Sequence, residues 1–186
     1  MSAVVPGAVP YKASLAKSLI GPAGEYHCLA QLLARGYLAT PAPPATPEAD
    51  ILVLSLDGAI AATIQVKTRT RGGDRGWMMN AKHEKIIRPH LFYAFVDFEQ
   101  SASPLVFVIH SSVVADVLRR DHEAWLAALG ANGQQHKDNP IRRVKPSYQP
   151  PVRGFPDGWM ENYRDRWEQI RQPGKAAGQG VLTGLS

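Results

Sequence analysis

The stretch that decides the fold is ADILVLSLDGAIAATIQVKTRT, residues 49–70. It contains two apolar runs, 50–56 and 59–67, rich in the β-branched and aliphatic residues that favour strands. Asp57-Gly58 joins them, and this dipeptide is typical of a two-residue hairpin turn. The stretch therefore predicts two antiparallel strands.

The length of this turn sets which residues lie opposite one another. With Leu56 facing Ala59, Asp50 lies opposite Gln65, and Lys67 projects from the same face two residues further on. Cβ atoms of directly opposite residues are about 4.5 to 5.5 Å apart, so three polar side chains converge. The other face is apolar and suits burial against a helix; it carries Ile51, Val53, Ile60, Ile64 and Val66.

A helix is predicted before the hairpin. It begins near Pro22, which suits a first-turn position, and ends at Gly36, which suits the left-handed C-terminal conformation. Glu25 falls on its apolar stripe, since helix positions three, four, seven and eight residues apart share a face. The stripe consists of Leu29, Leu32 and Leu33. A carboxylate there requires a cation, a hydrogen-bond donor or a metal.

Hydrophobic patterning predicts further strands at 91–98 and 105–110. Helical segments are predicted at 80–87, at 111–129 with Ser111 or Ser112 as its cap, and at 160–171. The Pro-rich segment 40–48 is interpreted as a connection, and 130–158 as polar turns. Residues 1–13 and 172–186 are predicted to be flexible ends of a single domain spanning 14–171.

Composition narrows the class of protein. The 186 residues are 45% hydrophobic, enough for one substantial core, and the net charge of +5 favours an anionic partner such as nucleic acid. The lone Cys28 excludes an internal disulfide, and the N-terminus lacks a secretory pattern. No apolar run approaches the roughly 20 residues of a membrane span, so we expect a soluble, cytoplasmic protein.

The converging side chains indicate a chemistry. An Asp carboxylate, a Gln carbonyl, a backbone carbonyl and Glu25 would make the oxygen-rich site that Mg²⁺ accepts. Such an ion lowers the pKa of a water and neutralises a phosphate, while Lys67 positions the water or stabilises developing charge. The constellation therefore predicts phosphodiester hydrolysis.

The order of helix Glu25, strand Asp50 and a returning strand ending in Gln65-Val66-Lys67 resembles the PD-(D/E)XK nuclease superfamily, including resolvase-like and intron-encoded homing endonucleases. The resemblance spans residues 21–118. It implies an α/β (α+β) fold with a restriction-endonuclease-like αβββαβ core, a mixed central sheet flanked by helices, to which the chain adds a C-terminal helical extension.

The same resemblance implies cleavage of DNA with Mg²⁺, or Mn²⁺ as its substitute, and action as a homodimer. Asp50 would bind the metal, Gln65 would take the second acidic place, Lys67 would be the motif lysine and Glu25 the helix glutamate. The sequence departs from the pattern twice: Glu48-Ala49 stands where proline usually precedes the aspartate, and Gln65 replaces an acid. The amide removes one negative charge and weakens metal binding unless Glu25 compensates.

Two basic groups are candidate phosphate contacts. The first consists of Arg69, Arg71 and Arg75, and the second of Arg142, Arg143 and Lys145. The alternative for both is an exposed, solvated loop, with Trp77 in the core rather than stacked on a base. His83 and Glu84 follow the site closely in the sequence, so either one is a candidate general base. The alternative is that His83 makes an ordinary local hydrogen bond.

Three functions follow from these patterns. The first is a Mg²⁺-dependent DNA endonuclease, and the second is a catalytically inactive relative that binds nucleic acid through its arginines. The third is an interaction protein whose last helix docks a partner through Trp159, Tyr163 and Trp167.

Overall fold

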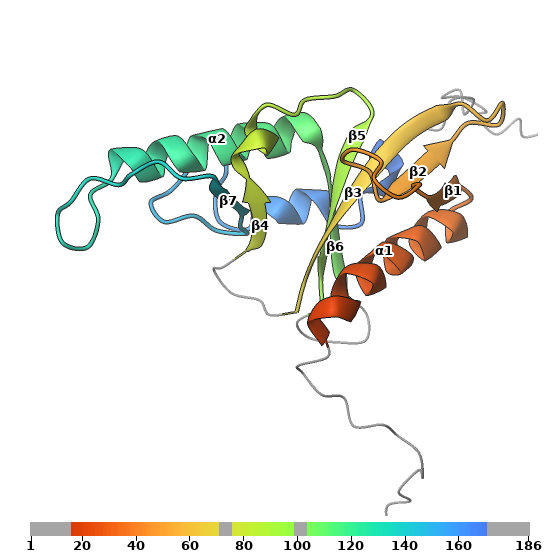
Figure 1. Ribbon diagram of the computed structural model, residues 1–186, viewed down its shortest axis with the longest axis horizontal. Coiled ribbons are helices and arrows are strands. Elements are labelled where there is room, and N and C mark those ends of the chain that lie inside the picture. The colour runs from red at the N-terminus through yellow and green to blue at the C-terminus, as the bar shows by residue number, and fades with distance from the viewer. Residues whose placement is uncertain (1–15, 71–75, 99–103, 171–186) are drawn as a thin grey trace, which may run out of the picture.

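The structure is a computed structural model that describes residues 16–70, 76–98 and 104–170. A five-stranded sheet in the order β1-β2-β3-β5-β6 separates two α-helices, and a second, two-stranded sheet pairs β4 with β7 (Figure 1). The elements are α1 (Ala16–Ala34), β1 (Leu38–Pro41), β2 (Ile51–Leu54), β3 (Ile60–Arg69), β4 (Trp77–Asn80), η1 (Ala81–Glu84), β5 (Leu91–Asp97), β6 (Leu105–His110), α2 (Ser111–Ala127), β7 (Ile141–Val144), η2 (Trp159–Tyr163) and η3 (Trp167–Gln169), where η denotes a 3₁₀-helix.

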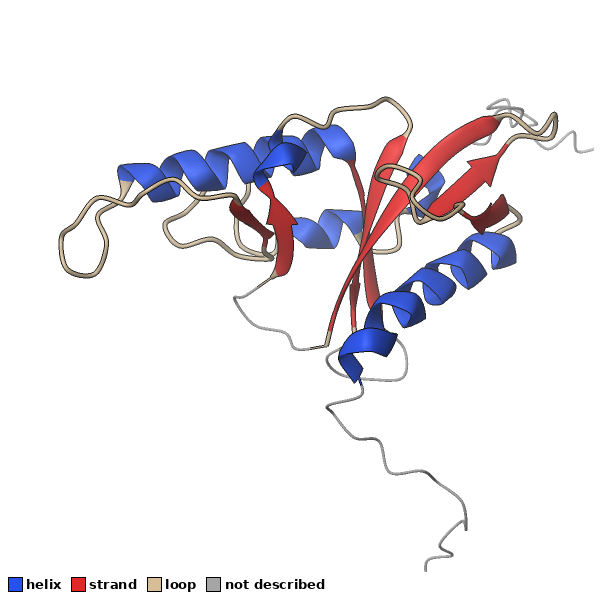
Figure 2. Cartoon of the chain, in the orientation of Figure 1, coloured by secondary structure: helices blue, strands red, loops and turns tan. Residues whose placement is uncertain are grey.

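The main sheet is mixed, as predicted. β3 runs antiparallel to β2 and parallel to β5, and β6 runs antiparallel to β5. The connection from β3 to β5 carries β4 and the short η1, where the implied αβββαβ order places an α-helix (Figure 2). The predicted helix at 80–87 is therefore wrong: only Ala81–Glu84 turns, as a 3₁₀-helix capped by Asn80.

The β2–β3 hairpin has the predicted register but a different turn. Ile51 pairs with Ile64, and the same register, extended by one residue, puts Asp50 opposite Gln65. The tip holds three residues rather than two, since Ser55 N donates to Ala59 O at 2.9 Å. A bulge between Val53 and Leu54 offsets the longer turn, so the pairing at the far end is the one expected from the two-residue loop.

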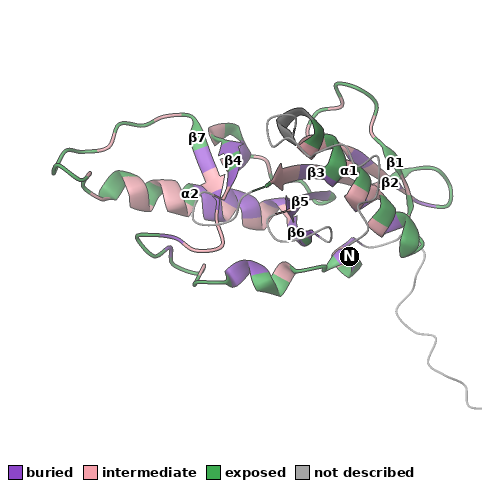
Figure 3. Cartoon of the chain, turned by 90° about the horizontal axis from the view of Figure 1, so that it is seen from below, coloured by how far each residue is buried: buried purple, intermediate pink, exposed green. Residues whose placement is uncertain are grey.

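Both faces of the main sheet are buried (Figure 3). Cys28 and Leu32 of α1 pack on the face that carries Ile51, Ile64 and Val66. The opposite face packs against α2, the small sheet and η2, and α2 is buried only in its first half. Every residue of β5 is buried, because this central strand contributes side chains to both cores.

Helix α1 begins six residues before its predicted start, so Pro22 lies inside it. Its C-terminal end is as expected, with Gly36 at φ 81°. The stripe facing the sheet is Gly24, Cys28 and Leu32, whereas Leu33, predicted to be buried, is 51% exposed.

The segment 159–170 differs most from the prediction. In place of one helix over 160–171 it forms η2 and η3, and Arg164 between them bridges to Phe107 of the edge strand β6. Trp159 is buried in one core and Trp167 in the other. The segment thus passes around the sheet edge, which a straight helix with both tryptophans on one face cannot do. The docking surface predicted from these tryptophans is wrong, since they are 4% and 1% exposed.

The strands predicted at 91–98 and 105–110 are confirmed as β5 and β6, and the helix at 111–129 as α2. Its cap is His110, whose side chain accepts from Ser112 N, rather than either serine. In the part of the chain that the structure describes, neither helix has the length and apolar character of a membrane span.

Gly24 sets how closely α1 approaches β3. A Cβ at this position would lie 2.1 Å from Thr68 Oγ1, whereas one at Gly21 of the same helix would have no atom within 4 Å. We predict that Gly24→Ala lowers the free energy of unfolding by about 1 to 3 kcal/mol through overpacking. Gly21→Ala should raise it by about 0.5 to 1 kcal/mol, because alanine favours the helix.

Urea denaturation measures both changes. Thr68→Ala, added to Gly24→Ala, should restore part of the loss, since it removes the obstructing hydroxyl. Equal stability of Gly24→Ala and Gly21→Ala would contradict this account of the α1–β3 contact.

Candidate active site

Asp50 is held at the end of the β2–β3 ladder by two hydrogen bonds. Its backbone N donates to Ile64 O at 2.9 Å, and its carboxylate Oδ2 accepts from Val66 N at 2.7 Å. The second carboxylate oxygen has no hydrogen-bond partner among the described residues. Asp50 therefore both ends the ladder and presents one oxygen for a ligand.

Glu25 approaches the same place from α1. It lines a small pocket of about 60 Å³ together with Asp50, Leu29 and Ile51. Burial and then the charge of Asp50 raise the pKa of Glu25, while the charge of Lys67 lowers it. Two carboxylates from separate elements thus share one cavity, an arrangement that a cation would stabilise.

Gln65 lies opposite Asp50 on β3, and its side-chain Oε1 is buried with no hydrogen-bond partner in the described parts of the chain. An unsatisfied buried acceptor costs about 1 to 3 kcal/mol, so the atom calls for a donor or a metal ion. Lys67, two residues along, is half-buried, and burial lowers its pKa while Asp50 raises it.

A second group of charged side chains, not predicted from the sequence, borders Lys67. Glu48 Oε2 lies 3.0 Å from Arg88 Nη2, and its Oε1 lies 4.0 Å from Lys82 Nζ. Glu48 adopts a left-handed φ of 56°, which brings it there. Glu48 stands two residues before Asp50 in the sequence, and this position alone gives no sign of the two basic partners.

His83 is buried and its Nδ1 lies 2.9 Å from Tyr93 Oη. Burial, followed by the charges of Lys67 and Lys82, lowers the pKa of His83 to about 4. The imidazole is therefore neutral at pH 7 and has a local hydrogen bond, as the simpler of the two sequence interpretations proposed.

Two of the arginines predicted to contact phosphate, Arg69 and Arg142, bind carboxylates within the fold. Arg69 Nη2 lies 2.6 Å from Asp97 Oδ2, and its guanidinium stacks 3.8 Å above the buried Trp77 ring. Arg142 is 5% exposed and binds Glu84 and Asn139 O. Both arginines are therefore held by contacts within the fold, and a phosphate contact of either one stays a prediction.

The remaining residues predicted to contact phosphate are Arg71, Arg75, Arg143 and Lys145. Lys145 lies 3.4 Å from Asp121, and it borders a pocket with Arg143 away from β2 and β3. Arg71 and Arg75 lie outside the described residues. The structure therefore brings Glu25 and Asp50 into one pocket with Lys67 within electrostatic reach, and it places Gln65 opposite Asp50 in the strand register. The second basic group lies beside a separate pocket.

The donor set suits a hard cation. Carboxylate and amide oxygens are the ligands that Mg²⁺ prefers, and the unpartnered Gln65 Oε1 is an atom such an ion would satisfy. Within residues 16–70, 76–98 and 104–170 no three His, Cys, Asp or Glu side chains group closely enough to hold a metal. A metal ion held by Glu25 and Asp50 would therefore need further oxygen donors, such as an amide or a backbone carbonyl.

Three comparisons with known proteins gave one similar solved structure. No protein-family profile matches the sequence, and no curated protein matches it. The solved structure of a bacterial homing endonuclease, I-Ssp6803I, is similar at a TM-score of 0.45 and 12% sequence identity, over 83% of this chain and 90% of that chain. These comparisons assign no family.

The raised pKa of Glu25 predicts a pH dependence of stability. Ionisation of Glu25 is disfavoured in the folded protein, so its contribution is present below the unfolded pKa of about 4.3 and is lost as the pH rises through the folded value. Without divalent ions, Glu25→Gln should therefore melt at increasingly higher temperature than the wild type as the pH rises from 4 to 8. Glu123→Gln, in an exposed pair on α2, is the control, and a constant difference for Glu25→Gln would contradict the prediction.

The Arg69–Asp97 pair predicts a structural cost. Asp97→Ala leaves a mostly buried guanidinium without its carboxylate, which should lower the free energy of unfolding by about 3 to 5 kcal/mol. Glu123→Ala breaks the exposed pair with Arg119 and should cost no more than about 1 kcal/mol. Chemical denaturation measures both, and equal losses would show that Arg69 is not held by Asp97.

Proposed function

We propose that this protein is a Mg²⁺-dependent endonuclease that hydrolyses phosphodiester bonds in DNA. The observation that carries the proposal is the convergence of the Glu25 and Asp50 carboxylates on one pocket, with the unpartnered oxygen of Gln65 opposite Asp50. The resemblance of these residues to the PD-(D/E)XK pattern and the net charge of +5 support DNA as the substrate.

Each residue has a distinct part in this proposal. Asp50, Glu25 and Gln65 would hold Mg²⁺, which when bound lowers the pKa of water and neutralises phosphate charge. Lys67 presents its ammonium to the scissile phosphate and stabilises the charge that develops on the phosphoryl oxygens. Because burial lowers its pKa, Lys67 also gives up a proton more readily than an exposed lysine.

A second candidate function is a DNA-binding protein without cleavage activity. It is favoured by the amide at position 65, which leaves two carboxylates where a third acid would strengthen metal binding. Both candidates bind DNA, and they differ in metal-dependent cleavage.

Cleavage of supercoiled and linear DNA in Mg²⁺ or Mn²⁺ tests the proposal. Asp50→Asn is the informative variant, since asparagine keeps an oxygen for Val66 N–H while removing the charge. We expect Asp50→Asn and Lys67→Ala each to reduce the cleavage rate by about 10²- to 10³-fold, the usual cost of losing one transition-state contact.

Asp57→Asn removes a carboxylate at the exposed hairpin tip and should cut at the wild-type rate. Binding of DNA by the wild type without cleavage in either metal would favour the inactive binder. Cleavage by Asp50→Asn as fast as by Asp57→Asn would remove Asp50 from the mechanism.

Gln65→Glu tests the amide directly. A third carboxylate should lower the Mg²⁺ concentration needed for half-maximal cleavage by at least about tenfold, because ligand charge sets affinity for hard cations. The thermal shift on adding Mn²⁺ gives a readout independent of activity and should increase in the same variant. An unchanged metal requirement in both measurements would place Gln65 outside the metal site.

One such site cleaves one strand at a time, so two copies would cut both strands of a duplex in a single binding event. We therefore also propose that two copies act together, as the family resemblance implies. Light scattering of the protein bound to a short DNA duplex in the presence of Ca²⁺ should give the mass of two protein chains per duplex.

A further inference from the structure

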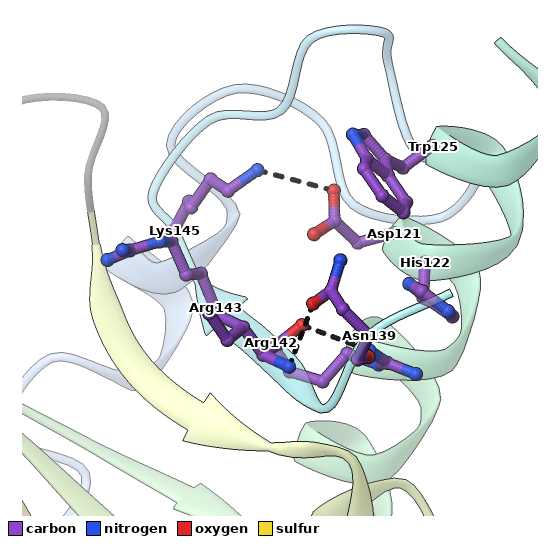
Figure 4. Close-up of a pocket in the computed structure, with 8 residues that line it drawn as sticks. Asp121, His122, Trp125, Asn139, Arg142, Arg143 and Lys145 are labelled. Atoms are coloured by element: carbon purple, nitrogen blue, oxygen red, sulfur yellow. Dashed lines mark hydrogen bonds and ion pairs between the residues drawn. The ribbon is translucent and has the colours of Figure 1, made fainter. Parts of the chain in front are cut away.

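A second pocket, of about 290 Å³, lies between α2 and β7, on residues that take no part in the proposed cleavage (Figure 4). Its volume is near the lower end of small-molecule sites. The residues that matter here are Asp121 and Trp125 of α2, Asn139, Arg142 and Arg143 of β7 or just before it, and Lys145 just after it.

The pocket walls are held in place by contacts within the fold. Trp125 stacks between two imidazoles, with ring centroids 4.1 Å from His136 and 5.6 Å from His122. Arg142 at the base is fixed by Glu84 and by Asn139 O. A ligand would thus meet a wall that is already ordered, which reduces the entropic cost of binding.

Trp125 also supplies an unused hydrogen-bond donor. The chain has four tryptophans, and the indole nitrogens of the other three donate to Val96 O, Lys145 O and Asp165 Oδ1. The Trp125 indole has no acceptor among the described residues, and its nitrogen lies on the ring edge turned toward Lys145 (Figure 4). An acceptor entering the pocket would satisfy it.

The charge of the lining favours an anion. Lys145 and Arg143 share the lining with one carboxylate, Asp121, which lies 3.4 Å from Lys145 Nζ, while the charge of Arg142 is paired with Glu84. Asp121 orients the lysine through this long contact, and together with the Asn139 amide it offers hydrogen bonds to polar groups. The pocket therefore combines an anion-binding side with a hydrogen-bonding side.

We propose that this pocket binds one nucleotide, its phosphate on the side of Lys145, Arg143 and the Trp125 N–H, and its sugar or base edge on Asp121 and Asn139. The nucleotide is either a free monophosphate or one unit of a DNA strand, which share this chemistry. The proposal is independent of cleavage at Asp50, because none of the residues is common to the two sites.

Indole N–H signals in ¹⁵N NMR test the proposal with the full chain. Inorganic phosphate, thymidine 5′-monophosphate and a short thymidine oligonucleotide are added in turn, with EDTA present so that no cleavage intervenes. We expect the Trp125 signal to move with the nucleotide and the other three indole signals to stay, which also reports an intact fold.

Affinities of variants are measured by calorimetry. Lys145→Ala and Trp125→Phe should each weaken nucleotide binding, the lysine change by at least about tenfold as expected for a charge-assisted hydrogen bond. Lys137→Ala, an exposed lysine outside the pocket, is the matched control and should bind as the wild type does.

A Trp125 signal that stays in place with all three ligands at millimolar concentration would overturn the proposal, as would equal weakening by Lys137→Ala. Movement with the monophosphate identifies a free-nucleotide site, and movement with the oligonucleotide alone identifies a strand contact; both support it. Asp50→Asn should bind the nucleotide normally, so loss of cleavage and loss of this binding are distinguishable.

Discussion

The end of the β2–β3 ladder is the constraint on which the candidate site depends. Asp50 binds β3 through its backbone N–H and through its carboxylate, so one residue both closes the hairpin and places a charged oxygen. The bulge at Val53–Leu54 corrects the register between the tip and this point. Without that correction, Gln65 and Asp50 would not be opposite each other, because a shift of one residue turns every side chain to the other face.

Folding pairs two of the predicted phosphate-binding arginines with carboxylates inside the protein. Arg69 binds Asp97, and Arg142 binds Glu84, so guanidinium groups that look available in the sequence are anchored beneath the surface. Both arginines also contact groups that fix their planes, which suits their rigid, forked geometry. The net charge of +5 thus indicates an anionic partner, but it does not indicate which lysines and arginines contact that partner.

The short η1 connects the two candidate sites. His83 binds Tyr93 and lies within the electrostatic reach of Lys67, while the next residue, Glu84, holds Arg142 at the base of the second pocket. Two consecutive residues of η1 therefore contact the surroundings of the two candidate sites, His83 near Lys67 and Glu84 at the second pocket.

Local sequence was enough to specify the two hairpin strands and the central strands, because period-two patterning acts between near neighbours. The pairing of Asp50 with Gln65 needed the bulge as well, since the turn is one residue longer than Asp57-Gly58 predicts. Long-range packing specified the rest. Trp159 and Trp167 fill cores on opposite sides of the sheet, so the segment bends around β6 instead of forming the helix that its local pattern favours. Burial in a tertiary core outweighs helix propensity, which contributes well under about 1 kcal/mol for most residues.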